Sequence, residues 1–367
     1  MANTDQNFPI INYDLNKSSY QNGVFHGEEY RQGIQELFKI RKNLLLNKNQ
    51  KLRPYLKDLA RQQWNISSQY APKLIEELQG ITDGSGLTKE DLVILNNYTD
   101  FRDINLPDEG CSTVHIKTKN NSISGQTWDM HSSAKKYVAL INIPGGDSSP
   151  GQIYFTLVGC LGMMGASTDK LLIGVNNLNT QNAKASLIWP ILVRNAIGIS
   201  KDYQELVKNV SRAPVTSGHN YLLSSTQAGS MWEVSPLYSE EVASLDNEND
   251  SYIFHTNHCM GENNKKIEHA SSISQTTHSR YEILEKNVPK IVNTGEVLNL
   301  LQGHENYPKS ICNHFNNNSA DPSATCGGGV VSFNENQAMF WRGCPVNDDF
   351  YKLHKFEIIN NNFQKMS

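Results

Sequence analysis

The sequence lacks an excess of charge of either sign. Its 367 residues include 33 lysines and arginines and 37 aspartates and glutamates, for a net charge of −4. A nucleic-acid partner would require a basic surface, so we expect none. No uncharged apolar run approaches the roughly 18 residues of a membrane span, and the first residues lack the basic and apolar regions of a secretory signal. We therefore expect a cytoplasmic protein without a membrane partner.

Cysteine is also sparse. The six cysteines lie far apart, with no CxxC pair and no Cys/His cluster at zinc spacing. The spacing predicts neither a disulfide framework nor a metal site, and we expect Cys259 and Cys344 to be small buried hydrophobes. No phosphate-binding loop is present, so no cofactor is expected, and a coenzyme A thioester would enter only as a co-substrate.

The N-terminal part of the chain has helical periodicity. Apolar residues recur at helical spacing at Ile34, Leu37, Ile40 and Leu44. Further helical runs follow, and a capping-box pattern starts at Thr88. The glycine-rich segment 80–88 predicts a turn between two of these helices. Residues 1–110 are therefore predicted to be mostly helical.

Beyond residue 110 the pattern changes to short strands between turns. Residues 111–116 and 123–128 predict the two strands of a hairpin. Strand-like runs then bracket helical segments at 186–210 and 278–302 without regular βαβ alternation, which favours an α+β fold. The chain divides into a helical segment, 1–110, and a β-rich segment, 111–367.

The Gly110–Cys111 step stands at this boundary, in the run Leu106-Pro-Asp-Glu-Gly-Cys. If the bond is cut, Cys111 becomes a terminal residue with both a thiol and a free α-amine. The pKa of a cysteine thiol is about 8.5 and that of an α-amine about 7.7–8.0, so the amine can accept the thiol proton. Cys111 could instead be an ordinary half-buried cysteine at the start of a strand.

An ordered set of segments accompanies this step. The predicted hairpin would bring Asp129 back beside Cys111, close to the new amine. The further segments are Leu172-Ile-Gly-Val-Asn-Asn-Leu178, Phe254-His-Thr-Asn-His258 and His278-Ser-Arg-Tyr281.

With this set, from about Phe25-His-Gly-Glu-Glu-Tyr-Arg to Phe340-Trp-Arg-Gly-Cys-Pro345, the chain resembles the acyl-coenzyme A:6-aminopenicillanic acid acyltransferase family. This is the penicillin-acyltransferase branch of the N-terminal-nucleophile (Ntn) hydrolases, and conjugated bile acid hydrolases and penicillin V acylases are more distant relatives. The resemblance implies an αββα sandwich, made as a precursor and cut between Gly110 and Cys111 into two chains that stay associated.

The resemblance also implies the site residues. Cys111 would be the nucleophile, and Asp129 would bond its amine or thiol. Asn257 and Asn176 would hold the oxyanion, with Asn177 as an alternative to Asn176. Arg280 would match an active-site arginine.

Bile acid hydrolases carry an arginine three residues before the aspartate, where this chain has Gln126. This departure favours the acyltransferase branch over a bile-salt substrate. The substrate would be a small-molecule amide or an acyl-CoA, and the acyl-enzyme would pass its acyl group to water or to an amine.

Each position could instead have a purely structural role: Asp129 and the asparagines in turns, and Arg280 as a solvated or salt-bridged side chain. Trp128 and Trp341 could line an acyl pocket or belong to the core.

Two other classes of protein remain open. An unprocessed Cys-His peptidase or transglutaminase-like enzyme would pair Cys111 with His115, His255 or His258. A catalytically inactive binding protein on the same scaffold would need neither Cys111 nor Asp129.

Overall fold

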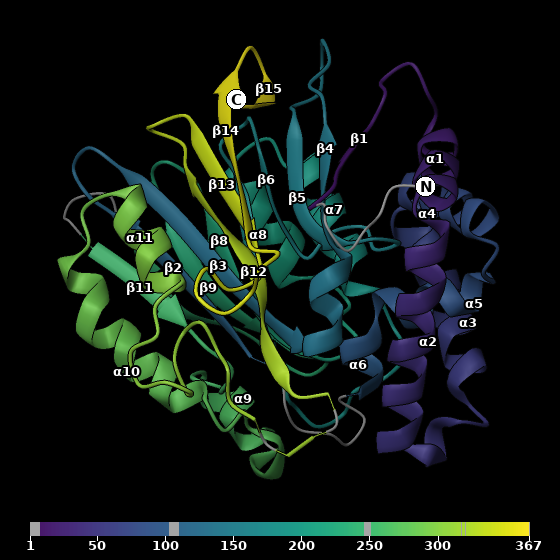
Figure 1. The fold of residues 1–367 in the computed structure, drawn as a ribbon. Coiled ribbons are helices and arrows are strands. Elements are labelled where there is room, and N and C mark those ends of the chain that lie inside the picture. Colours follow the sequence, from purple (N-terminus) through teal and green to yellow (C-terminus); the bar gives the residue numbers. More distant parts are fainter. Residues whose placement is uncertain (1–7, 103–109, 246–250, 317, 320, 367) are drawn as a thin grey trace.

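Two β-sheets lie face to face at the centre of the computed structural model (Figure 1), which describes residues 8–102, 110–245, 251–316, 318, 319 and 321–366. The eight-stranded sheet has the spatial order β1 (Ile10–Asn12), β4 (Val138–Ile143), β5 (Gln152–Leu157), β6 (Met164–Ser167), β7 (Leu172–Leu178), β8 (Gly218–Ser224), β9 (Gly229–Val234) and β10 (Ser239–Leu245). The seven-stranded sheet has the order β11 (Ser251–His255), β2 (Cys111–Lys117), β3 (Ser122–His131), β12 (Ser323–Ser332), β13 (Gln337–Arg342), β14 (Lys352–Ile359) and β15 (Asn362–Lys365).

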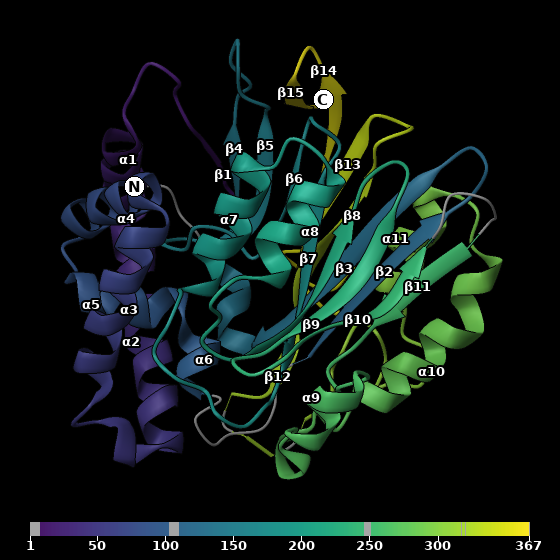
Figure 2. The ribbon, with the colours of Figure 1, turned by 180° about the vertical axis from the view of Figure 1, so that it is seen from behind.

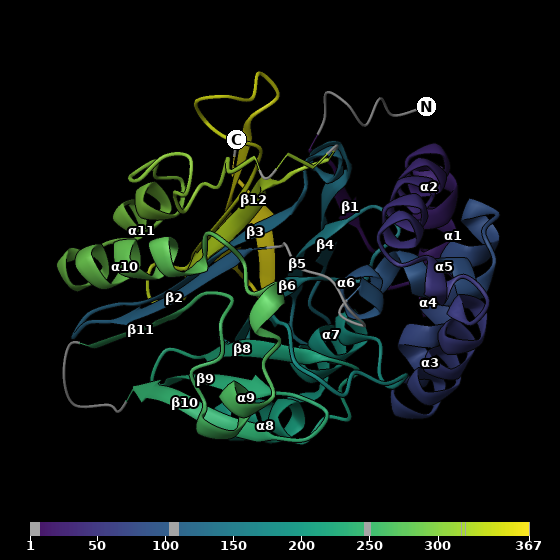
Figure 3. The same ribbon diagram turned by 90° about the horizontal axis from the view of Figure 1, so that it is seen from below.

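Helices cover the outer faces of both sheets (Figure 3). The helices α10 (Thr277–Asn287) and α11 (Thr294–Leu301) lie on the seven-stranded sheet, and α7 (Trp189–Ile199) and α8 (Tyr203–Ser211) lie on the eight-stranded sheet. The short helix α9 (Glu262–Lys266) precedes α10. Every residue of β3 is buried, because a central strand between two covered faces exposes neither side to water. The predicted α+β class and αββα sandwich are confirmed.

The N-terminal helices form a separate group beside the sandwich (Figure 2). They are α1 (Ser19–Glu29), α2 (Arg31–Lys48), α3 (Leu56–Tyr70), α4 (Pro72–Ser85), α5 (Lys89–Asn96) and α6 (Tyr98–Arg102). The capping box predicted at Thr88 is present at the start of α5. The same segment also supplies β1, which pairs in parallel with β4. Within the described residues, no helix has the length and apolarity to span a membrane.

The turn predicted at residues 80–88 begins too early, because α4 continues to Ser85. Its glycines allow a close approach of two helices instead of a chain reversal. A Cβ on Gly80 would lie 2.1 Å from the Tyr20 carbonyl oxygen in α1, and one on Gly23 would lie 2.1 Å from the Glu77 carbonyl oxygen in α4. The helix ends at Gly86, whose φ of +73° suits a left-handed cap.

Buried polar contacts join the N-terminal helices to the sandwich. The Glu77 carboxylate of α4 and the Arg194 guanidinium of α7 form an ion pair at 2.9 Å, with both side chains 4% exposed. The Gly159 N–H, next to β5, donates to His26 Nε2 of α1 at 2.9 Å. Because a buried charge that loses its partner is strongly destabilising, these contacts fix the helical group on the sandwich.

Candidate active site

The β2–β3 hairpin positions Cys111 as predicted. Cys111 is the first residue of β2 and lies opposite Trp128 of β3. The register places Gly110 beside Asp129, whose backbone N–H donates to the Gly110 carbonyl oxygen at 2.8 Å. Residues 106–109 of the expected cleavage motif lie outside the described residues.

The packing around Gly110 leaves no room for a side chain. A Cβ there would stand 2.6 Å from Asp129 Oδ2 and 2.8 Å from Arg280 Nη2. The residue before the candidate nucleophile is therefore in direct contact with both a carboxylate and a guanidinium. Glycine is the residue type that fits this position.

The side chain of Asn257 binds the backbone nitrogen of Cys111. Its N–H donates to Asn257 Oδ1 at 2.6 Å, and Arg280 Nη2 donates to the same oxygen at 2.9 Å. The Asn257 side-chain amide donates in turn to the Asn177 carbonyl oxygen at 2.9 Å. The two donors beside Oδ1 and the acceptor beside Nδ2 are consistent with only one orientation of the Asn257 amide. In the intact chain Asn257 therefore binds the Cys111 nitrogen through Oδ1, and its amide nitrogen donates to the Asn177 carbonyl.

Arg280 is a buried member of the site, so the interpretation as a solvated side chain is wrong. It is 0% exposed, and its Nη1 donates to the Cys111 carbonyl oxygen at 2.5 Å and to Ser112 Oγ at 3.0 Å. Burial lowers the pKa of Arg280, whereas the negative charges of Asp129 and Cys111 raise it. A guanidinium starts from a pKa above 12 and stays protonated, so it supplies a fixed positive charge beside the Gly110–Cys111 bond.

Asp129 is fixed from the next strand. Thr325 of β12 donates its hydroxyl to Asp129 Oδ1 at 2.6 Å, and the backbone N–H of Asn313 donates to Thr325 Oγ1 at 2.7 Å. The β3–β12 register shifts at this point, between Thr325 and Gly327. Such a bulge redirects side chains and is frequent beside active sites.

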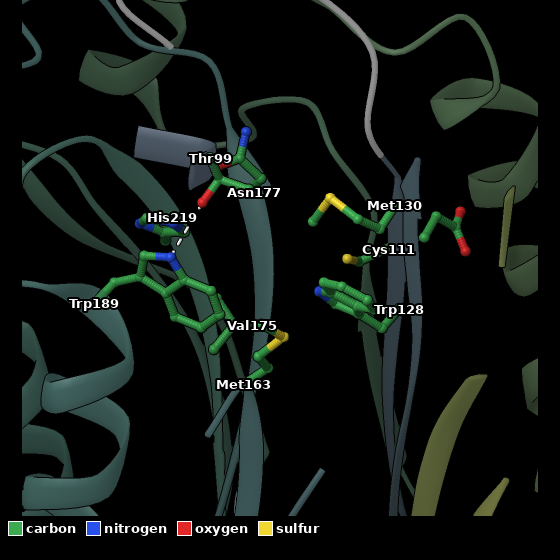
Figure 4. Close-up of a pocket in the computed structure, with 10 residues that line it drawn as sticks. Thr99, Cys111, Trp128, Met130, Met163, Val175, Asn177, Trp189 and His219 are labelled. Atoms are coloured by element: carbon green, nitrogen blue, oxygen red, sulfur yellow. Dashed lines mark hydrogen bonds between the residues drawn. The ribbon is translucent and has the colours of Figure 1, made fainter. Parts of the chain in front are cut away.

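Cys111 borders a small apolar pocket (Figure 4). Cys111 and Trp128 form one wall, and Trp189 and His219 face them from the other side. The remaining lining residues are Thr99, Asp129, Met130, Met163, Val175 and Asn177. The cavity measures about 20 Å³, which is room for about one water molecule.

Of the two neighbouring asparagines of β7, Asn177 lines this pocket. Successive residues of a strand point to opposite faces, and Asn176 is directed between the sheets. Its Oδ1 accepts from Thr113 Oγ1 at 2.7 Å and from Asn220 Nδ2 at 2.8 Å. The geometry therefore favours Asn177 over Asn176 as the second asparagine of the site.

The three histidines considered as partners of Cys111 have other contacts. His115 Nδ1 bonds Ser124 Oγ at 2.8 Å, and His255 Nε2 bonds Glu233 Oε1 at 2.9 Å. His258 contacts the hydroxyls of Thr256 and Thr277, and burial lowers its pKa to about 4. None of the three lines the pocket in the described part of the chain.

Gln126 and Trp341 have structural positions. The Gln126 amide bridges the sheets, accepting from the Val175 N–H at 2.7 Å and donating to the Val175 carbonyl at 2.6 Å. Trp341 is 0% exposed in the cluster under α10 and α11, away from the pocket. Of the two tryptophans, Trp128 therefore borders the cavity and Trp341 belongs to the core.

Comparison with known proteins identifies a protein family and relatives that this chain resembles. A family model for acyl-coenzyme A:6-aminopenicillanic acid acyl-transferase matches residues 116–332. This range includes Asp129, Asn176, Asn257 and Arg280 and begins after Cys111. The 40 kDa form of the acyl-coenzyme A:6-aminopenicillanic-acid-acyltransferase of Emericella nidulans is 25% identical over 301 residues, which cover 80% of this chain and 82% of the relative.

Solved structures with low similarity include an acid amidase and a bile acid hydrolase. The Caenorhabditis elegans ortholog of N-acylethanolamine-hydrolyzing acid amidase has a TM-score of 0.45 and 12% identity, covering 60% of this chain and 92% of that chain. A mutant conjugated bile acid hydrolase from Clostridium perfringens has a TM-score of 0.43 and 8% identity, covering 70% and 96%. The match of the family model over more than half of the sequence shows that the chain is an enzyme belonging to the acyl-coenzyme A:6-aminopenicillanic acid acyl-transferase family.

Proposed function

We propose that the chain is an autoproteolytic cysteine Ntn hydrolase that cuts its own Gly110–Cys111 bond and then uses Cys111 to cleave or transfer an acyl group. One observation carries the proposal. The Asp129 N–H holds the Gly110 carbonyl oxygen, and Asn257 Oδ1 holds the Cys111 nitrogen. One side of the peptide bond is thus bound by its hairpin partner and the other by a residue 146 positions away in the sequence.

Self-cleavage would begin with attack of Cys111 Sγ on the Gly110 carbonyl carbon. The Asp129 N–H would stabilise the negative charge that develops on the carbonyl oxygen. The carbon–nitrogen bond then breaks, the nitrogen takes the proton that the thiol lost and becomes the α-amine of Cys111, and Gly110 is left as a thioester on the sulfur. Water hydrolyses this thioester, releasing a Gly110 carboxylate and the free thiol.

The groups around the bond suit the products of this reaction. Asn257 Oδ1, which accepts one N–H of Cys111 in the intact chain, can accept from the amine that replaces it. The Arg280 guanidinium adjoins Gly110 and would neutralise the new carboxylate. The pairing of Glu77 with Arg194 and of β1 with β4 crosses the cut, so the two chains would stay associated.

The second stage would use the free amine as the base for the Cys111 thiol. The thiolate attacks an amide or thioester carbonyl, the leaving group departs with a proton, and an acyl-enzyme forms on Cys111. Asn177 lines the pocket and is the candidate amide donor for the oxyanion, for which its amide would have to exchange its present contact with Asn179 Oδ1 at 2.9 Å. Water then completes hydrolysis, or an amine completes acyl transfer.

The pocket favours an apolar acyl group. Trp128, Met130, Met163, Val175 and Trp189 supply its apolar walls. Its volume of about 20 Å³ is too small for an acyl chain, so the proposal includes widening of the pocket after cleavage. The relative from Emericella nidulans bears the name of an acyl-coenzyme A acyltransferase, which supports acyl-CoA thioesters as candidate donors beside amides.

The test is the intact mass and N-terminal sequence of the purified wild-type protein and of Cys111→Ala. Cys160→Ala is the control, because it also removes a buried thiol, but one whose sulfur contacts Arg41 and the Leu95 carbonyl instead of the cleavage site. We expect fragments 1–110 and 111–367 from wild type and control, and an intact chain from Cys111→Ala.

The cleaved protein is then treated with amides and acyl-CoA thioesters of increasing acyl length. The proposal requires a mass increase of one acyl group on fragment 111–367. An uncut wild-type chain that still turns over substrate would contradict it in favour of a Cys-His enzyme. A properly folded wild-type chain that is neither cut nor acylated would favour an inactive binding protein.

A further inference from the structure

Four side chains outside the active site converge on one point. His304 follows α11, Cys312 and His314 lie in the connection from α11 to β12, and Cys344 lies in the turn between β13 and β14. Their imidazole nitrogens and sulfurs all lie within 4.8 Å of one another. The wide spacing of these residues along the sequence did not predict this cluster, and Cys344, buried as expected, lies beside a histidine nitrogen.

The distances match those around a tetrahedral zinc ion. Zn–S bonds of about 2.3 Å and Zn–N bonds of about 2.05 Å at tetrahedral angles place two nitrogens about 3.3 Å apart and a nitrogen and sulfur about 3.5 Å apart. The two Nε2 atoms of His304 and His314 are 3.2 Å apart. Cys312 Sγ is 3.5 Å from His314 Nε2, and Cys344 Sγ is 3.2 Å from His304 Nε2.

The donor set suits zinc chemically. Two thiolates and two neutral imidazoles balance the charge of a divalent zinc ion and form one of the usual structural zinc sets. Both cysteines are buried and both histidines are half-buried. The Val346 N–H donates to Cys344 Sγ at 3.4 Å, which is a contact that a thiolate accepts well.

The surrounding backbone holds the ligands in place. The Cys312 N–H donates to the Gly303 carbonyl at 3.0 Å, and the His314 N–H donates to the Pro308 carbonyl at 3.1 Å. On the other loop, the Cys344 N–H donates to Asp348 Oδ2 at 2.7 Å. The ligand-bearing loops are thus shaped without the metal.

We propose that His304, Cys312, His314 and Cys344 bind one zinc ion, which links the α11–β12 connection to the β13–β14 turn. The ion has a structural role, because four protein ligands leave no open position for a substrate. It also supports the active site from a distance. Asn313, between two ligands, donates its N–H to Thr325, and Thr325 in turn donates its hydroxyl to Asp129.

The first test is the zinc content of the full-length wild-type protein, measured by plasma mass spectrometry after dialysis against a metal-free buffer. We expect one zinc per chain. Exchange with Co²⁺ should give the visible absorption bands of a tetrahedral site together with thiolate-to-cobalt charge-transfer bands. Both measurements use the native chain and need no substitution.

The second test compares Cys344→Ser and His314→Asn with Cys160→Ala. Loss of an outer-shell partner costs roughly 10–100-fold in metal affinity, so loss of a direct ligand should cost at least as much. Cys160→Ala should keep full zinc content and the cobalt spectrum. Zinc content measured before any assay of cleavage separates this proposal from the proposed function.

Three results would overturn the inference. They are a wild-type chain without zinc that also gives no tetrahedral cobalt spectrum, a disulfide between Cys312 and Cys344 in freshly purified protein, and a zinc content unchanged in both ligand variants.

Discussion

Replacement of Gly110 by alanine is the sharpest test of the site geometry. The new methyl group would stand 2.6 Å from Asp129 Oδ2 and 2.8 Å from Arg280 Nη2. Ordinary contacts begin at 3.4 Å, so the carboxylate and the guanidinium must retreat by about 0.8 and 0.6 Å. These movements would disturb the contacts around the peptide, since the Asp129 carboxylate accepts from Thr325 and Arg280 donates to the Cys111 carbonyl.

The expected effect is mainly on the rate of self-cleavage. A misplacement of about 1 Å costs on the order of 100-fold in rate, so a shift of this size should slow processing by about 10–100-fold, or about 1.4–2.7 kcal/mol in the activation free energy. Overpacking of a buried site should also lower the unfolding free energy by about 1–3 kcal/mol. The assay follows the appearance of fragment 111–367 by mass spectrometry after synthesis in a cell-free system, with urea unfolding measured in parallel.

Gly295→Ala is the matched control. A Cβ on Gly295 would meet nothing closer than Asn293 Oδ1 at 3.4 Å, and the residue lies in α11 away from the site. This variant should be processed at the wild-type rate. If Gly110→Ala is also cleaved at the wild-type rate, the contacts around Gly110 do not govern the reaction and the argument from geometry fails.

Asn177→Ala should lower kcat by about 10²–10³-fold if its amide serves the oxyanion. Asn176→Ala should mainly lower the unfolding free energy by about 1–3 kcal/mol, because Thr113 and Asn220 lose their shared acceptor. Equal losses of kcat in both variants, measured by steady-state kinetics, would contradict this distinction. Arg194→Met leaves the Glu77 carboxylate buried without its partner and should cost about 3–5 kcal/mol in urea unfolding; a loss below about 1 kcal/mol would show that this pair does not hold the helical segment on the sandwich. Burial, followed by the charge of Arg194, lowers the pKa of His26 to about 3 from 6.5, so between these values the unfolded chain binds a proton that the folded chain does not. The unfolding free energy therefore falls as pH falls, by about 2 kcal/mol from this histidine between pH 7 and pH 5. In urea unfolding, His26→Gln should make the unfolding free energy depend less steeply on pH. An unchanged pH dependence would refute the lowered pKa of His26.

The sequence predicted well those features that depend on neighbouring residues. The helical periodicity of the first segment, the capping box at Thr88 and the hairpin after Cys111 all appear in the structure. A hairpin with a short turn leaves little freedom in register, which is why Asp129 could be placed beside Cys111 from the sequence. The strands β10, β11 and β14 were not predicted, and most of their residues are exposed or half-buried.

The glycine-rich segment 80–88 shows where local signals mislead. Glycine permits both a turn and a close approach of two backbones, and the sequence does not say which applies. The partner that decides, α1, lies more than 50 residues earlier in the chain. The choice between turn and helix thus depended on a tertiary contact.

For the active site, too, some features follow from the local sequence and others from tertiary contacts. The sequence by itself determined the helical first segment, the α+β class and the pairing of Cys111 with Asp129, because these follow from periodicity and from contacts within one hairpin. Only the tertiary structure decided that Arg280, 169 residues from Cys111, is a buried contact of the Gly110–Cys111 step, and that Asn177 instead of Asn176 faces the pocket. It also brought four metal-type ligands together from two separate loops. Which distant segments meet is set by how the two sheets stack and how their helices cover them, and the packing of many side chains at once decides this, not the spacing along the chain.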